Sequence, residues 1–463
     1  MRKFIPSLII LFITFGLAFS QPSVSPKYIT LWEHSQANSN FPSYMGTGST
    51  ERGLAFGSVD GNDVLLMVSR LGTTKILVLN PLNGDSLGTL DITNVSGGTF
   101  SLNDVEISED GKIFACNLTT NSNTSSFKVY KWDNLAAQPV NVIDFTTSTT
   151  YRLGDMFTVV GSTSDNTLTI YVASSSNNKV FRFTTTDGGN SFTSTEITLS
   201  DGAAGTVHNV YPKTPGVSGF YTNSAGRNIK EYDENGNLIA TLPGSVIATG
   251  STATKLLQHA GKIYLAVFNY GGGNENLRFV DITNGVINAQ LVFVTSGLGT
   301  VSNGNGTGDI GFKNNGDGTF DLFVLGTNNG LARYRTQKYA NVTFNVNMKV
   351  KMAKGQFDPS QDTLVVRGYF NNWAGNADVL IDEDGDSIYT VTKKYFVTGD
   401  TTEFKFVMVK PSGDIWENVS NRVLVFEEGD NTYNCYFDND SVITAQAQVT
   451  FNVNMRVKIL KGD

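Results

Sequence analysis

The 463-residue chain contains only two cysteines, Cys116 and Cys435, and only 16% of its residues are charged. Because the two cysteines fall in different predicted domains, they exclude a disulfide framework, and we expect two buried thiols that pack as small apolar side chains. The formal net charge of −8 comes without a basic stripe, which argues against a nucleic-acid partner. The fold therefore has to be stabilised by its apolar core.

Signatures of catalytic, metal and cofactor sites are also missing. The three histidines, His34, His208 and His259, lack metal-ligand spacing, and no nucleophile elbow, P-loop or dinucleotide fingerprint occurs. The sequence thus predicts no metal and no cofactor. Some aspartates near predicted strand starts could form an acid–base pair in a central channel, although turn or blade-stabilising roles are favoured; these are Asp91, Asp104, Asp155 and Asp309.

The one long apolar run lies at the N-terminus. Arg2 and Lys3 precede an apolar segment that extends to Phe19, and small residues around Ala18 suit cleavage. This pattern predicts a signal peptide over residues 1–20, with a transmembrane anchor as the alternative. We therefore expect a protein that is secreted or lies at the extracellular surface, without a membrane span once the signal is removed.

Glycine, by contrast, is abundant at 47 residues, and short strand-like runs fill the chain. From about residue 28 to residue 337, two or three such runs recur in units of roughly 40–50 residues, which favours a β-propeller. The runs are joined by Asn83-Gly84, Asp110-Gly111, Asn235-Gly236 and Asn315-Gly-Asp-Gly318, which we expect to form primed hairpin turns.

The propeller should have six blades, with five or seven left open by the count. Its sixth unit is one strand short, and an isolated strand, Tyr28-Ile-Thr-Leu-Trp32, precedes the first unit. Pairing the two would close the ring and remove the exposed edges of an open sheet. No WD or kelch signature occurs, so the architecture carries no family name.

Residues 340–440 alternate apolar and polar side chains in six or seven runs, which predicts an antiparallel β-sandwich and makes the whole chain all-β. Three segments stand out in it, Gly368-Tyr-Phe-Asn-Asn-Trp373, Phe404-Lys-Phe406 and Trp416-Glu-Asn-Val-Ser-Asn-Arg422. In order and spacing they resemble the G-x-F-x-x-W, Y/F-K-F and W-E…N-R segments of the starch-binding domain, a carbohydrate-binding module of amylases and glucoamylases.

This resemblance implies a set of carbohydrate-binding residues. Trp373 and Trp416 would stack on consecutive glucose units of an α-glucan, and Lys405 and Asn421 would hydrogen-bond to its hydroxyls. Glu417 completes the binding motif together with its neighbour in the motif, Arg422, and both are given supporting roles. Taken singly, each residue also has a bland interpretation: Trp416 as a core plug and Lys405 as a solubilising side chain.

The family's second binding site has no motif here. Tyr369 and Tyr389 are the available aromatic residues, and a module with a single site is expected. A third feature, the acidic run with Asp382, Asp384 and Asp386, is typical of a hairpin turn but also of a calcium loop. The turn is favoured because the run lacks the downstream glutamate of an EF-hand.

The last seventeen residues nearly repeat an earlier stretch. Residues 447–463 match residues 340–356 at twelve of seventeen positions, so we expect the first strand of a second, truncated module. The sequence as a whole predicts a secreted, multi-modular protein that binds an α-glucan polysaccharide, with the propeller as a recognition or scaffold domain. The alternatives are a propeller glycosidase or lyase with appended modules, and a non-catalytic surface adhesin or spacer.

Overall fold

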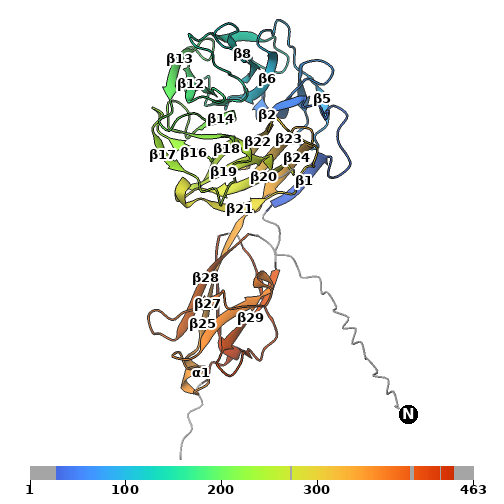
Figure 1. The fold of residues 1–463 in the computed structure, drawn as a ribbon. Helices are drawn as coiled ribbons and strands as arrows, with labels where there is room; N and C mark the ends of the chain where they lie inside the picture. The colour runs from blue at the N-terminus through green and yellow to red at the C-terminus, as the bar shows by residue number, and fades with distance from the viewer. Residues whose placement is uncertain (1–27, 272–273, 397–400, 428, 443–463) are drawn as a thin grey trace, which may run out of the picture. The chain divides into compact units, whose positions relative to one another are not determined.

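The computed structural model describes residues 28–271, 274–396, 401–427 and 429–442. The chain divides into two compact units, one spanning Lys27–Gln337 and one that includes Lys338–Asp463 (Figure 1). Strands dominate both units, as the all-β prediction requires. No helix in the described ranges is both long and apolar enough to cross a bilayer. The predicted signal peptide (1–20) and truncated module (447–463) lie outside the described residues.

The first unit is a six-bladed β-propeller, each blade a four-stranded antiparallel sheet. In Figure 1 the blades are arranged around a common centre, and the innermost strands of neighbouring blades contact one another around the whole ring. The first three blades, from the innermost strand outward, comprise β2 (Glu51–Val59), β3 (Asn62–Ser69), β4 (Lys75–Leu79) and β5 (Ser86–Thr89); β6 (Phe100–Ile107), β7 (Ile113–Leu118), β8 (Phe127–Trp132) and β9 (Val140–Phe145); and β10 (Phe157–Val160), β11 (Thr169–Ala173), β12 (Lys179–Thr184) and β13 (Thr193–Thr198).

The remaining three blades complete the ring. They comprise β14 (Thr206–Pro212), β15 (Phe220–Ala225), β16 (Lys230–Tyr232) and β17 (Leu238–Thr241); β18 (Ser251–His259), β19 (Lys262–Asn269), β20 (Asn276–Asp281) and β21 (Gln290–Val294), with the short turn η2 (Val286–Asn288); and β22 (Gly308–Asn314), β23 (Phe320–Gly326), β24 (Gly330–Thr336) and β1 (Tyr28–Ser35). Inner strands such as β7 are buried on both faces because each blade packs between two others, so they form continuous apolar runs.

The N-terminal strand closes the ring, as the sequence predicts. Strand β1 pairs antiparallel with β24, from Tyr28 opposite Thr336 to Ser35 opposite Gly330. The last blade therefore combines three strands from the end of the unit with one from its start. Strand β1 is thereby the outermost strand of the closing blade, and the pairing joins the start of the unit to its end in one sheet.

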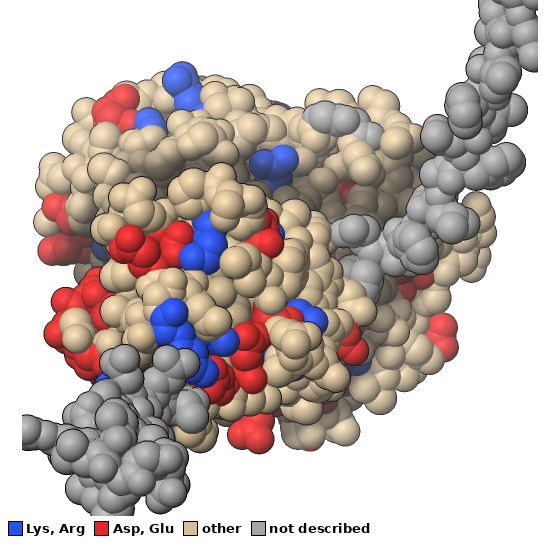
Figure 2. Space-filling model, turned by 90° about the horizontal axis from the view of Figure 1, so that it is seen from below, with Lys and Arg blue, Asp and Glu red and all other residues tan. Residues whose placement is uncertain are grey.

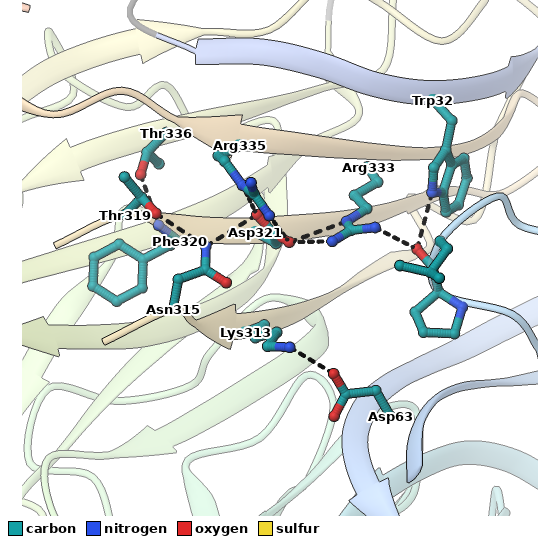
Figure 3. Close-up of polar contacts among 12 residues, drawn as sticks. Trp32, Asp63, Lys313, Asn315, Thr319, Phe320, Asp321, Arg333, Arg335 and Thr336 are labelled. Carbon is teal, nitrogen blue, oxygen red and sulfur yellow. Dashed lines mark hydrogen bonds and ion pairs between the residues drawn. The ribbon is translucent and has the colours of Figure 1, made fainter. Parts of the chain in front are cut away.

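A buried carboxylate anchors the closing blade (Figure 3). Asp321 on β23 accepts hydrogen bonds from Arg333 Nε at 3.1 Å, Arg335 Nη2 at 2.9 Å and Asn315 Nδ2 at 3.1 Å. Arg333 Nη1 then donates to the carbonyl of Pro81 in the first blade at 3.0 Å. The indole N–H of Trp32 on β1 donates to the same Pro81 oxygen, also at 3.0 Å, so one network ties the first and last blades together.

The predicted sites do not form type I′ turns, and such turns are found at other positions. A type I′ turn needs two consecutive positive φ values, whereas only the glycines have a positive φ at the predicted sites, Asn83-Gly84, Asp110-Gly111, Asn235-Gly236 and Asn315-Gly-Asp-Gly318. Two-residue loops with both φ positive are found instead at Asp60-Gly61 (50° and 76°) and Ala260-Gly261 (46° and 77°). The predicted sites are longer loops, in which glycine alone supplies the left-handed residues.

The second unit is a β-sandwich of two sheets. One sheet has the order β28 (Ile388–Phe396), β25 (Tyr339–Asn347) and β32 (Gly429–Tyr436); the other has β27 (Val379–Leu380), β26 (Thr363–Gly368), β29 (Thr401–Val409) and β30 (Ile415–Trp416), with β31 (Arg422–Val425) also on β29. Helix α1 (Lys349–Ala353) and the short turns η3 (Tyr369–Asn371) and η4 (Phe437–Asn439) complete the unit.

The pairing in this sandwich is antiparallel with one exception. Strand β25 pairs antiparallel with β28 but parallel with β32, which joins the first strand of the unit to the last. The core between the sheets contains Phe344, Phe404, Phe406 and their neighbours. In β29 the core side chains alternate with Glu403, Lys405 and Val407, which therefore face away from the core.

The charged surface is mixed in sign. In the space-filling view of Figure 2, Lys and Arg side chains lie beside Asp and Glu, and no continuous basic stripe crosses the described residues on the face shown. This distribution agrees with the absence of a basic stripe from the sequence and with the net charge of −8.

Candidate functional site

The outer face of the β26–β29–β30 sheet brings the two tryptophans of the sandwich together. The ring centroids of Trp373 and Trp416 lie 6.2 Å apart, with 38° between the ring planes. Trp416 is 39% exposed and Trp373 is half-buried. Tyr369 stands edge-on to Trp373, with the ring centroids 5.6 Å apart. The bland interpretation of Trp416 as a core plug is therefore wrong, because its ring is partly open to solvent.

A constrained turn places Trp373. After β26, Asn371 Oδ1 accepts the N–H of Gly368 at 2.8 Å, and Asn371 Nδ2 donates to the Val366 carbonyl at 2.8 Å. Asn372 and Trp373 both adopt left-handed conformations, with φ of 57° and 55°. A tryptophan in this region is strained, and the Trp373 N–H compensates by donating to the Gly368 carbonyl at 2.9 Å.

Arg367 holds the two tryptophan-bearing loops in register. Its Nε donates to the Gly375 carbonyl at 2.9 Å, and its Nη1 pairs with the Asp414 carboxylate at 2.6 Å. The guanidinium carbon also lies 5.3 Å from the Trp416 ring centroid, within cation–π range. Sequence reasoning assigned Arg367 no role. Its one signal is that an arginine precedes the first motif and Asp414 precedes the third.

Lys405 lies on the same face of the sheet as Trp416. Arg367 is directly opposite Lys405 across β26 and β29, and Val407, two residues further, is opposite Trp416. Lys405 Nζ donates to the Glu417 carbonyl at 3.3 Å, which leaves two of its three N–H groups without a partner among the described residues. The structure therefore groups Lys405 with the tryptophan pair.

Asn421 lies beside Glu403, which precedes Lys405 by two residues on β29. Its side chain is exposed, and Nδ2 donates to Glu403 Oε2 at 2.8 Å. Because Glu403 precedes Lys405 by two residues on the same face, Asn421 extends the row formed by Trp416 and Lys405. Its described contacts join it to Glu403 rather than to either indole.

Glu417 has a structural role. It is 2% exposed, and its carboxylate accepts hydrogen bonds from Arg422 Nε (2.9 Å), the Phe406 N–H (2.9 Å) and the Asp438 N–H (3.1 Å). Burial alone would lower the pKa of Arg422, but the hydrogen bonds and charge of Glu417 raise it above its ordinary value. Both residues therefore stabilise the sheet at β29 and β30. Because both Glu417 oxygens accept these hydrogen bonds, neither is free for a ligand.

Two further candidates of the sandwich are Tyr389 and the acidic run of three aspartates. Tyr389, considered for a second site, is only 8% exposed and packs in the core, edge-on to Phe357 at 5.3 Å. Asp382, Asp384 and Asp386 place oxygens within 4.8 Å of one another. The Asp382 carboxylate accepts backbone N–H groups of its own loop, including that of Ser387 at 3.0 Å, which is compatible with the favoured turn, and the choice between turn and calcium loop stays a prediction.

The aspartates of the propeller channel join neighbouring blades. Asp104 on β6 accepts the N–H of Phe157 at 2.9 Å, and Asp309 on β22 accepts the N–H of Leu54 at 2.8 Å. Burial raises the pKa of Asp104 well above its usual range, and the neighbouring carboxyl of Asp309 raises it further. The favoured blade-stabilising role therefore fits both residues.

Next to this pair, Lys255 forms a buried ion pair with Glu106. Burial raises the pKa of Glu106 to about 7, and the charge of Lys255 opposes this increase. The other two aspartates are turn or ion-pair residues. Asp91 accepts the N–H of Thr93 at 2.7 Å, and Asp155 accepts Arg152 Nε at 2.7 Å. Both cysteines are free thiols, Cys116 buried and Cys435 half-buried.

Two solved structures are similar to this chain. The solved structure of a DUF4623 family protein from Bacteroides eggerthii DSM 20697 has a TM-score of 0.51 and 18% identity, covering 64% of this chain and 72% of that chain. At this identity the likeness concerns the fold alone. A structure described as YCF48 bound to D1 peptide has a TM-score of 0.32 and 14% identity, covering 61% of this chain and 77% of that chain. A comparison with curated proteins found no match.

The profile of a domain of unknown function, DUF4623, matches residues 8–297. The match runs through the first five blades and ends before β22, where the closing blade begins. Since it covers more than half of the sequence, the chain belongs to the DUF4623 family.

Proposed function

We propose that the sandwich binds an α-glucan through the Trp373–Trp416 pair and that the protein is a secreted carbohydrate-binding protein. The observation that carries the proposal is the geometry of the two indoles, 6.2 Å between centroids and 38° between planes. The resemblance of the three sequence segments to the starch-binding domain supports it. The propeller serves as a recognition or scaffold domain.

The tilted pair suits a curved chain of glucose rings. The apolar C–H face of a sugar stacks on a flat, electron-rich indole, with little loss of side-chain entropy. Successive rings of an α-linked glucan turn relative to one another, whereas those of a β-1,4 glucan form a flat ribbon. Two indoles that meet at an angle therefore favour the α-linked polymer.

Polar groups beside the indoles would receive the sugar hydroxyls. Lys405 offers the two N–H groups that have no partner among the described residues, and the exposed amide of Asn421 lies further along the same face. Arg367 acts as a positioning residue, because its hydrogen bonds to Gly375 and Asp414 fix both loops before a ligand arrives. Such preorganisation reduces the entropy cost of binding.

Affinity electrophoresis of the protein through gels containing glycogen, amylopectin, dextran or a β-1,4 glucan tests the proposal. We expect retardation by glycogen and amylopectin, and Trp373→Ala or Trp416→Ala should weaken it roughly tenfold or more, as for a hot-spot residue. Tyr436→Ala is the matched control, since Tyr436 is also 39% exposed but lies on the other sheet.

The outcome that contradicts the proposal is equal retardation of the parent and both tryptophan variants. Equal retardation by the β-1,4 glucan would contradict the assignment to an α-linked chain. The enzymatic alternative gains no specific support from the channel, because the carboxyls of Asp104 and Asp309 are used by backbone N–H groups of neighbouring blades.

A further inference from the structure

The propeller has a cavity of about 590 Å³ at the end of the channel where the innermost strands begin. Five blades contribute to its lining through residues at or just before these strand starts, among them Arg52, Asn103, Asp155, Thr206 and Thr307. Below it the channel narrows to a space of about 10 Å³ beside Asp104. The cavity is therefore a pocket with a floor, large enough for a small ligand.

The charge around this pocket is not balanced. Arg152 is neutralised by Asp155, whose carboxylate also accepts the hydroxyl of Ser175. Arg52 and Arg70 form no ion pair among the described residues, although the charge of Asp155 raises the pKa of both. Arg52 Nη1 donates to the Thr307 hydroxyl at 2.9 Å, while its Nε is buried without a partner in the described part of the chain.

The charge of Arg52 acts on the neighbouring Arg70 guanidinium. Burial and, second to it, the nearby charge of Arg52 lower the pKa of Arg70 to about 9. Burial likewise lowers the pKa of Arg52; the charge of Asp155 opposes this effect, and the charge of Arg152 adds to it. An anion in the pocket would relieve this repulsion, in a protein whose net charge is −8.

An aromatic ring and hydroxyl groups accompany the positive charge. Phe100 lines the pocket and is 41% exposed, and the Arg70 guanidinium lies 3.6 Å from its ring centroid. Hydroxyls of Thr99, Thr120 and Ser176 are also in the lining. Exposed aromatic surface next to hydroxyls is poorly suited to a bare inorganic anion, but it suits a ring with one apolar face and several hydroxyls.

We propose that this pocket binds a carboxylate-bearing sugar, such as a uronic acid at the end of an acidic glycan. Arg52 pairs with the carboxylate, Phe100 contacts the apolar face of the ring, and the hydroxyls of the lining bind the sugar hydroxyls. The site is separate from the tryptophan pair of the sandwich and goes beyond the proposed α-glucan binding.

Isothermal titration of the whole protein with D-galacturonate, D-galactose and inorganic phosphate tests this site. We expect galacturonate to bind roughly tenfold or more tightly than galactose, because galactose leaves the guanidinium unpaired. Arg52→Gln should weaken galacturonate binding by a similar factor. Arg182→Gln is the matched control, since Arg182 also has a buried unpartnered Nε but lies on β12 outside the pocket.

Phe100→Ala provides a second variant that leaves the buried Arg52–Thr307 contact in place, and it should also weaken galacturonate binding. A thermal scan identifies any variant that fails to fold. Equal binding of galacturonate and galactose, or unchanged binding by folded Arg52→Gln and Phe100→Ala, would overturn the proposal. Phosphate binding as tight as galacturonate would overturn its sugar component and leave a general anion site.

Discussion

Replacing Glu417 by glutamine should destabilise the sandwich without removing its glucan site. The buried Glu417 carboxylate accepts the Arg422 guanidinium and the N–H groups of Phe406 and Asp438. Glutamine has the same shape, but its amide nitrogen faces these donors and cannot accept. Arg422, itself 8% exposed, is left as a buried charge without a counter-ion.

The expected loss follows from the burial of the pair. Breaking a buried ion pair by removing one partner costs about 3–5 kcal/mol, and we expect Glu417→Gln to fall near 3 kcal/mol because one oxygen remains. The exposed Glu427 is the control, since its change to glutamine should cost less than about 0.5 kcal/mol. The double variant Glu417→Leu/Arg422→Met should recover part of the loss, because it leaves no unpaired charge.

Native-state amide hydrogen exchange measures this at the residues concerned. The Phe406 and Asp438 amides should lose protection in Glu417→Gln, whereas amides of the propeller should be unchanged because the two units are separate. The folded variant should still be retarded by glycogen. A loss below about 0.5 kcal/mol would refute the assigned structural role, and loss of glucan binding with full stability would show instead that Glu417 contacts the ligand.

Two further predictions concern the propeller. Asp321→Ala leaves the Arg333 and Arg335 guanidiniums without their carboxylate and should lower the free energy of unfolding by about 3–5 kcal/mol in thermal unfolding. The control Lys313→Gln, at the half-exposed pair with Asp63, should lower it by less than about 1 kcal/mol. Equal losses in the two variants would contradict this prediction. Burial raises the pKa of Glu275 to about 8, so the folded state holds an extra proton between the unfolded pKa of 4.5 and about 8, and propeller stability should fall as pH rises through this range. Glu275→Gln should flatten that fall in urea titrations at pH 5 and pH 8, and an unchanged slope would contradict it.

The elements that could be predicted from the sequence are those set by local pattern and by counting. The alternating runs predicted an all-β chain, and a sixth unit one strand short predicted the pairing that β1 makes with β24. The order of the three motif segments likewise placed Trp373 and Trp416 in one module, and the structure brings their rings to 6.2 Å.

The elements that could not be predicted depend on partners distant in sequence. Arg367 contacts Asp414, 47 residues away, and nothing in its own strand distinguishes it from a solvent-exposed cation. Glu417 follows an exposed tryptophan in a two-residue strand, which is too short for alternation to show that its side chain turns inward. The turn type predicted at Asp110-Gly111 is wrong because loop length selects the turn type, and strand register fixes the loop length.

The blade-to-blade contacts of the channel explain why its aspartates do not by themselves indicate catalysis. Strands β6, β14 and β22, one in every second blade, each direct a side-chain oxygen to an N–H of the next blade: Asp104 to Phe157, Asn209 to Thr254 and Asp309 to Leu54. Because Asn209 makes this bond with an amide oxygen, the geometry requires an acceptor and not a negative charge. Burial accordingly raises the pKa of both aspartates, toward the neutral form that an amide resembles. The centre of the ring is thus a structural layer, and the open cavity above it is where a ligand can reach charged groups that the fold does not use.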